Sequence, residues 1–224
     1  MGRTRRALRA VALAAAVGGV SAVQGAPPAA VEGGGRPAVT HESGVLAEWV
    51  HAARDNAGRP FAIVDKKAAS LFLYAADGRL LDATPVLLGM GLGDHSVPGV
   101  GDLPPARIPP ADRTTPAGRF ASEPGRNLDG EAVVWFDYDA GLAIHRLRAD
   151  AARAARLQRL QSRLPGAQRV SAGCVVVPVA FYESLIEPLL GRRRGVIYVL
   201  PEMRSIGDVF AGMQGRDRTD DAGE

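Results

Sequence analysis

Cysteine is almost missing from this sequence, because its 224 residues include only Cys174. One cysteine excludes an intramolecular disulfide, and with it the class of small secreted domains held together by disulfides. The four histidines lie at positions 41, 51, 95 and 145, without the spacing of metal ligands, so we expect no metal site. Aromatic residues make up only 5% of the chain, against 27 glycines and 16 prolines. This composition favours a loop-rich, strand-based domain over a helical bundle.

Long hydrophobic runs are also lacking, apart from one near the N-terminus. Residues 1–25 combine four arginines with an apolar run from Val11 to Val23 and a small-residue cleavage site that ends at Gly25. This pattern is typical of a secretory signal peptide, and the run is too short to span a bilayer comfortably. No cysteine stands directly after this run, which excludes a lipid-anchored lipoprotein. We therefore expect an exported protein of the periplasm or cell envelope, with no stable membrane span after cleavage.

An excess of one charge sign is lacking in the predicted mature chain. Removing the four arginines of residues 1–25 from 27 basic residues leaves 23, against 24 acidic residues, a net charge of −1. This balance gives no general attraction to nucleic acid, which we exclude as a partner. A helix predicted over residues 150–164 carries arginines at 153, 156, 159 and 163. Both a solvated helix face and contact with an anionic wall polymer would explain this row.

The rest of the chain reads as one domain that is mainly β, with few helices. Residues 26–58 are predicted to be a linker followed by a helix over 43–56, and residues 202–224 a loose C-terminal tail. Apolar runs bounded by turn residues predict an antiparallel meander and further strands, at 61–64, 70–74, 80–90, 133–138, 141–147 and 196–200. The segment 91–110 is too rich in Gly and Pro for regular structure, and Pro178 is predicted to begin a helix that ends at Leu190.

Two residues stand out as candidates for chemistry, Cys174 and His145. His145 follows an apolar, strand-like run, and Cys174 follows the small-residue turn Ser171-Ala172-Gly173. A lone thiol at a tight turn, with a histidine on a neighbouring strand, is typical of a Cys–His nucleophile. A single cysteine is more often a small buried apolar residue, so the pair alone leaves a structural role open.

Four features, taken in chain order, resemble the catalytic domain of L,D-transpeptidases, the YkuD-like fold, over residues 59–201. They are an entry hairpin at 61–74, a Thr-Pro-x-Gly-x-Phe segment at Thr115–Phe120, the strand histidine His145, and the Ser-x-Gly-Cys segment at Ser171–Cys174. The resemblance implies a β-sandwich or barrel of mixed sheets.

The resemblance also implies a mechanism on peptidoglycan stem peptides. Cys174 would attack the carbonyl between an L-centre and a D-residue, and His145 would take the thiol proton and return it to the leaving amine. Backbone N–H groups of Gly173 and Cys174, with Ala172, would hold the oxyanion. Ser171 or a backbone carbonyl would orient His145, and the helix that begins at Pro178 would favour the thiolate. No metal or organic cofactor is implied.

Three positions depart from the family's pattern. Arg146 stands where a small residue is common, Ala172 where His or Tyr is common, and Val176 where the family usually has Arg or Asn. Arg146 or Arg148 is the candidate to replace the polar group lost at Val176. Three functions follow: an exported L,D-transpeptidase, an L,D-carboxypeptidase or amidase that trims stem peptides, and a non-catalytic, wall-binding regulatory domain. The acceptor, the oligomeric state and the export route stay open.

Overall fold

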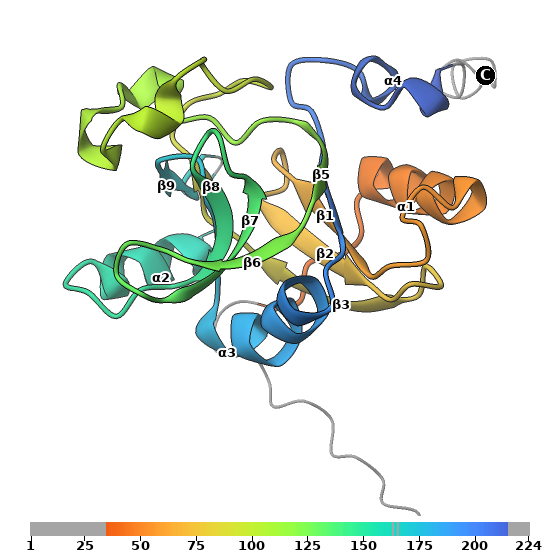
Figure 1. The fold of residues 1–224 in the computed structure, drawn as a ribbon, viewed down its shortest axis with the longest axis horizontal. Helices are drawn as coiled ribbons and strands as arrows, with labels where there is room; N and C mark the ends of the chain where they lie inside the picture. Colours follow the sequence, from red (N-terminus) through yellow and green to blue (C-terminus); the bar gives the residue numbers. More distant parts are fainter. Residues whose placement is uncertain (1–34, 163, 165, 215–224) are drawn as a thin grey trace, which may run out of the picture. The chain divides into compact units, whose positions relative to one another are not determined.

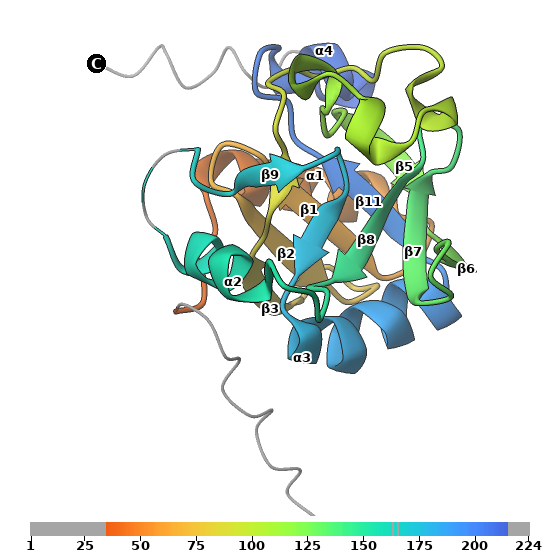
Figure 2. The ribbon, with the colours of Figure 1, turned by 90° about the vertical axis from the view of Figure 1, so that its left-hand side faces the viewer.

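Two open β-sheets face each other across an apolar core in this computed structural model (Figures 1 and 2). It describes residues 35–162, 164 and 166–214. The predicted signal peptide over residues 1–25 lies outside the described residues, as do Arg163 and the end of the predicted tail. Within the described part of the chain, no helix is both long and apolar enough to cross a membrane.

The first sheet has five strands in the order β3-β2-β1-β11-β5. They are β1 (Phe61–Asp65), β2 (Ser70–Tyr74), β3 (Leu80–Pro85), β5 (Gly118–Ala121) and β11 (Val196–Val199). β1 and β11 pair in parallel, and the other neighbours are antiparallel. The predicted meander is therefore confirmed, but its third strand is shorter than residues 80–90. Pro85 has no N–H to continue the ladder, and the chain leaves to form β4 (Leu88–Gly89), which pairs with β9 (Arg169–Ser171).

The second sheet has four strands in the order β10-β8-β7-β6. They are β6 (Glu123–Arg126), β7 (Ala132–Asp137), β8 (Leu142–Arg146) and β10 (Val175–Val177). β10 and β8 are parallel, whereas β8, β7 and β6 are antiparallel neighbours. The predicted fold class, mainly β with mixed sheets and few helices, is confirmed. Both sheets keep free edge strands, so the described strands make a sandwich and not a closed barrel.

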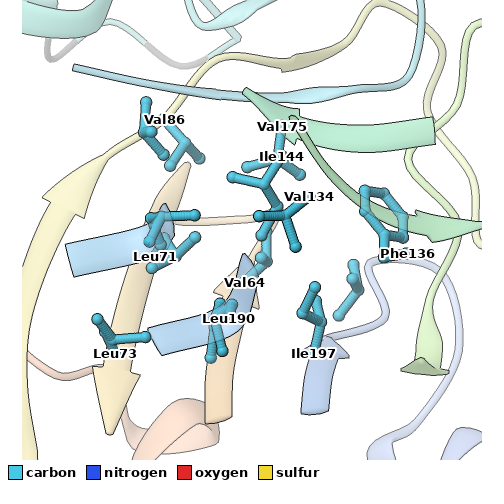
Figure 3. Close-up of a cluster of buried hydrophobic side chains, with 14 of the residues drawn as sticks. Val64, Leu71, Leu73, Val86, Val134, Phe136, Ile144, Val175, Leu190 and Ile197 are labelled. Carbon is cyan, nitrogen blue, oxygen red and sulfur yellow. The ribbon is translucent and has the colours of Figure 1, made fainter. Parts of the chain in front are cut away.

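Alternate residues of the two sheets fill the core between them (Figure 3). Val64, Leu71 and Ile197 come from the five-stranded sheet, and Val134 and Ile144 come from the four-stranded sheet. Successive side chains of a strand point to opposite faces, so the residues on either side of Ile144 point away from the core. His145 must lie on the outer face of β8.

The five-stranded sheet buries its other face under α1 (His41–Ala53) and the C-terminal segment. Ile206, Phe210 and Met213 are buried there, and the Trp49 indole N–H donates to the Gly212 carbonyl at 3.1 Å. The prediction of a loose tail is therefore wrong for residues 202–214. This segment forms α4 (Ile206–Val209) and the turn η5 (Ala211–Met213), and burial of its apolar side chains stabilises both.

Two helical segments and a series of short turns connect strands of the sheets. The predicted helix over 150–164 is shorter, as α2 (Arg153–Gln161), and two of its arginines have partners within the chain: Arg156 with Asp150 and Arg159 with the Ala167 carbonyl. The helix predicted from Pro178 is present as α3 (Val179–Phe181) followed by a π-helical segment η4 (Tyr182–Arg192). The Gly- and Pro-rich segment contains only short 3₁₀ turns, η1 (Val100–Asp102), η2 (Pro105–Arg107) and, just beyond it, η3 (Pro110–Asp112).

Candidate active site

His145 lies in β8, and Cys174 directly precedes β10, the strand that pairs with β8. β8 and β10 pair in parallel with Ile144 opposite Val175 and His145 opposite Val176. Ile144 and Val175 point into the core (Figure 3), so His145 and Val176 point away from it. Cys174 directly precedes β10 and is half-buried; it packs against the edge of the core cluster, and its sulfur lies 3.9 Å from the Gly141 carbonyl oxygen. The strand that carries His145 therefore neighbours the strand that follows Cys174, as the sequence predicts, and the meeting of thiol and imidazole stays a prediction.

The imidazole of His145 is held by its own strand. Its Nδ1–H donates to the carbonyl oxygen of Arg146 at 2.8 Å, because a carbonyl can only accept. This bond places the proton on Nδ1 and leaves Nε2 with a lone pair that can take a proton. Of the two orienting groups predicted for His145, Ser171 or a backbone carbonyl, the structure therefore has the backbone carbonyl.

Ser171 organises the turn that carries the thiol instead. Its hydroxyl donates to the Cys174 carbonyl at 2.6 Å and accepts the N–H of Gly173 at 3.1 Å. The predicted oxyanion hole therefore loses one donor, because the Gly173 N–H already has an acceptor. Among the hydrogen bonds of the described residues, none engages the N–H of Cys174 or Ala172. These two groups remain available as donors.

Only glycine fits at position 173. Its backbone has φ 123°, a conformation that L-residues with a side chain rarely adopt. A Cβ atom there would lie 2.6 Å from the Thr114 carbonyl oxygen and 2.7 Å from the Leu142 Cδ2. The segment that contains Thr114 therefore packs directly against the nucleophile turn.

Burial keeps both members of the pair neutral. It raises the pKa of the Cys174 thiol, and this outweighs the Ala143 N–H and the Arg148 charge, which lower that pKa. Burial also lowers the pKa of His145, more than its bond to the Arg146 carbonyl raises it. The Cys174 thiol and the His145 imidazole are therefore both uncharged near neutral pH, so a reaction at the sulfur would need a base that takes its proton.

The expectation that the helix at Pro178 favours the thiolate is not met. The three residues of β10 separate Cys174 from that helix, which places its first turn about 10 Å further along the chain. The effect of a helix terminus falls off within about one turn. The raised pKa of the Cys174 thiol agrees with this geometry.

The pH dependence of alkylation checks this electrostatic state. Since only the thiolate reacts with iodoacetamide, we expect slow alkylation of Cys174 at pH 7 and a midpoint above the value of about 8.5 for a free thiol. Deprotonation increases with pH, so the rate should rise only in the alkaline range. The measurement is the rate of adduct formation from pH 5 to pH 10, with a small thiol peptide as control. A midpoint below that of the peptide would show a preformed thiolate–imidazolium pair.

The two arginines predicted to bind substrate occupy different positions. Arg146 follows His145 in β8 and pairs with Glu131 at 3.5 Å, and Arg148 reaches the same Glu131 at 3.7 Å. Arg148 lies beyond the end of β8 and pairs with Asp129 at 3.2 Å. Its positive charge lowers the pKa of both Cys174 and His145, so it lies near the pair. A role of either arginine in binding substrate stays a prediction.

The position where the family commonly has a polar group is apolar in this protein. Val176 is 5% exposed and packs with Leu87, Leu147 and Leu160, under α2. Its side chain therefore belongs to a small hydrophobic cluster beside the pair. Any polar contact with substrate on this side must come from another residue.

Sequence reasoning missed an aromatic pair on the outer face. Trp135 of β7 lies opposite Ala143 of β8, on the outer face of the sheet and two strands from β10. Tyr138 is 76% exposed and meets Trp135 edge to face, with 5.4 Å between the ring centroids. The alternation of residues 132–137, in which Val134 and Phe136 are buried, would have placed Trp135 outward.

No group of three or more His, Cys, Asp or Glu side chains in the described part of the chain is arranged to hold a metal ion. A surface pocket of about 410 Å³ lies at the end of α1, lined by residues that include His51, Arg54 and Asn56. It contains none of the residues discussed above.

The sequence matches no protein-family model and no curated protein. Among solved structures, this one is similar to the helical cell shape determining protein Pgp2 from Campylobacter jejuni, with 16% identity, a TM-score of 0.43 and coverage of 65% of this chain and 49% of that one. It is also similar to the L,D-transpeptidase from Xylanimonas cellulosilytica, with 17% identity, a TM-score of 0.39 and coverage of 63% and 60%. For the L,D-transpeptidase from Mycobacterium smegmatis these values are 16%, 0.38, 63% and 58%. The chain spans about half to three fifths of the length of these neighbours.

Proposed function

We propose that this protein is an exported peptidoglycan L,D-transpeptidase that works through an acyl-enzyme on Cys174. The observation that carries the proposal is the parallel pairing of β8, which carries His145, with β10, which directly follows Cys174, together with the His145 Nδ1–H held by the Arg146 carbonyl. This arrangement supplies a nucleophile, a base in the required tautomer and an orienting acceptor. We assign the catalytic domain to residues 59–201 and the signal peptide to residues 1–25.

The geometry supports the following sequence of steps. The Cys174 sulfur attacks the carbonyl carbon of the stem peptide while its proton passes to the His145 Nε2. The N–H groups of Cys174 and Ala172 stabilise the oxyanion, for which a single donor is worth about 3–4 kcal/mol. The C–N bond then breaks, and His145 gives its proton to the leaving amine. An amine of a second stem attacks the thioester, loses a proton to His145, and releases the thiol.

Two groups on the outer face would bind the stem peptide. Arg148 carries the positive charge near Cys174 and would pair with a substrate carboxylate, taking the role that Val176 cannot fill. Trp135 and Tyr138 would contact apolar parts of the substrate, two strands from β10. Ala172, next to the thiol turn, has a side chain too small to block an acceptor that approaches there.

A carbapenem tests whether the thiol acylates. Attack of Cys174 on the β-lactam carbonyl opens the ring, and the thiol proton ends on the ring nitrogen, so the intact mass should rise by the full mass of the carbapenem. Peptide mapping should place the adduct on Cys174. Absence of an adduct on the folded protein would contradict the proposal and leave the non-catalytic, wall-binding domain.

Stem substrates then separate the two enzymatic functions. Incubation with disaccharide-tetrapeptide and analysis of the muropeptides should show cross-linked dimers if an amine accepts the acyl group. Shortened stems without dimers would identify an L,D-carboxypeptidase or amidase, in which water accepts it. A catalytically active trimming enzyme would still form the carbapenem adduct, so the two experiments are read together.

A further inference from the structure

Thr115 connects the nucleophile turn to the interior of the protein. It is fully buried, and its hydroxyl donates to the Gly173 carbonyl at 2.9 Å and accepts the Gly89 N–H at 3.0 Å. The hydroxyl therefore donates one hydrogen bond and accepts another, both within the protein. Both partners are main-chain groups, and neither is a side chain on the outer face of the four-stranded sheet.

The bond to Gly173 controls the direction of the neighbouring N–H. In a trans peptide the C=O of residue 173 and the N–H of residue 174 point in opposite directions within one plane. Glycine allows such a plane to rotate more easily than other residues do. With the Gly173 oxygen fixed on the buried Thr115, the Cys174 N–H points away from it. This N–H is one of the two donors left for the oxyanion.

A network of buried charges fixes Thr115 itself. The Lys66 ammonium group has no exposed surface and donates to the Thr115 carbonyl at 3.0 Å and to Asp94 at 2.7 Å. Asp94 also accepts the N–H groups of residues 202, 203 and 204. Glu202 pairs with Arg169, which begins the strand that leads to Ser171. Thr115 is therefore held by its main chain and has little freedom to follow a movement of Gly173.

We propose that Thr115 is a positioning residue, whose hydroxyl locks the Gly173–Cys174 peptide so that the Cys174 N–H serves the oxyanion. The inference rests on the proposed function, because an oxyanion forms only if Cys174 is acylated. Thr115 does not touch substrate in this arrangement. Its hydroxyl acts through Gly173 alone.

The test compares two reactions of the same thiol. Acylation by a carbapenem passes through an oxyanion, whereas alkylation by iodoacetamide does not. Thr115→Val keeps the shape of the side chain and removes the hydroxyl, so it should lower the acylation rate about 10- to 100-fold, less than the 100- to 1,000-fold of deleting a donor. The alkylation rate should stay within about twofold. Thr115→Ser keeps the hydroxyl and should restore most of the acylation rate.

The ratio of the two rates decides the outcome. An unchanged ratio in Thr115→Val, with wild-type acylation intact, would overturn the positioning role and leave the proposed function standing. Wild-type protein that alkylates but never acylates would overturn the proposed function and this inference with it. Should Thr115→Val not fold, Thr115→Ala takes its place, because it also removes the hydroxyl and adds no apolar methyl group next to the Gly89 N–H. The same fall in the ratio is then expected, and the same unchanged ratio would count against the role.

Discussion

Replacing His145 with glutamine should slow acylation of Cys174 by a carbapenem about 1,000-fold, within the range of 100- to 10,000-fold that general acid–base catalysis supplies. The thiol is neutral at rest because burial raises its pKa, so attack requires a base that takes the proton as the C–S bond forms. Glutamine can accept a hydrogen bond but cannot take the proton. The measurement is the time course of the intact-mass adduct at pH 7.5.

A matched control is available on α1. His51 is exposed and belongs to the helix that covers the far face of the five-stranded sheet, so His51→Gln should acylate at the wild-type rate. Because the pKa of His145 lies below its usual range, wild-type acylation should also persist to lower pH than an ordinary histidine allows, and fall only as His145 becomes protonated. Equal rates for His145→Gln and wild type would remove His145 from the mechanism.

Replacing Gly173 with alanine should lower the free energy of unfolding by about 2–5 kcal/mol and abolish detectable acylation. A positive φ costs a residue with a side chain about 1–2 kcal/mol. The new Cβ would also lie 2.6 Å from the Thr114 carbonyl oxygen, and overpacking of this kind costs a further 1–3 kcal/mol. Relief of the clash must move either Thr114 or the turn, and the turn carries the sulfur. Urea unfolding followed by circular dichroism gives the stability, and intact mass gives the acylation.

Gly130 provides the control for backbone strain alone. It has φ 78°, and a Cβ built there meets no atom within 4 Å. Gly130→Ala should therefore cost only the strain, about 1–2 kcal/mol, and leave acylation unchanged. If both variants lost the same stability, the close approach of Thr114 to the nucleophile turn would be contradicted.

The local pattern of the chain was enough to predict most elements of the two sheets. Residues 61–64 and 70–74 are apolar runs separated by turn residues, and they form β1 and β2 as a hairpin. The helix predicted over 43–56 is present as α1, because its apolar positions recur at helical spacing. The C-terminal segment was misjudged because Ile206, Phe210 and Met213 are too sparse to indicate a helix by themselves. They are buried only because α1 and the sheet already present an apolar face.

Residue types and their local order determined the candidates for chemistry at this site. Cys174 is the one thiol and follows a small-residue turn, and His145 follows an apolar run. Both could be identified as candidates without a structure, since the reactivity of a thiol or an imidazole belongs to the side chain. The strand period also determined that His145 and Ile144 face opposite ways.

Contacts between distant parts of the chain decided the rest. The pairing of β8 with β10 brings His145 beside the thiol turn, and the Thr114–Thr115 segment fixes the conformation of Gly173. Whether the Gly173 N–H is free, which arginine faces the sulfur and which way the pKa values move all depend on what surrounds each group. A sequence specifies donors, acceptors and charges, but their partners and their burial exist only once the chain has folded.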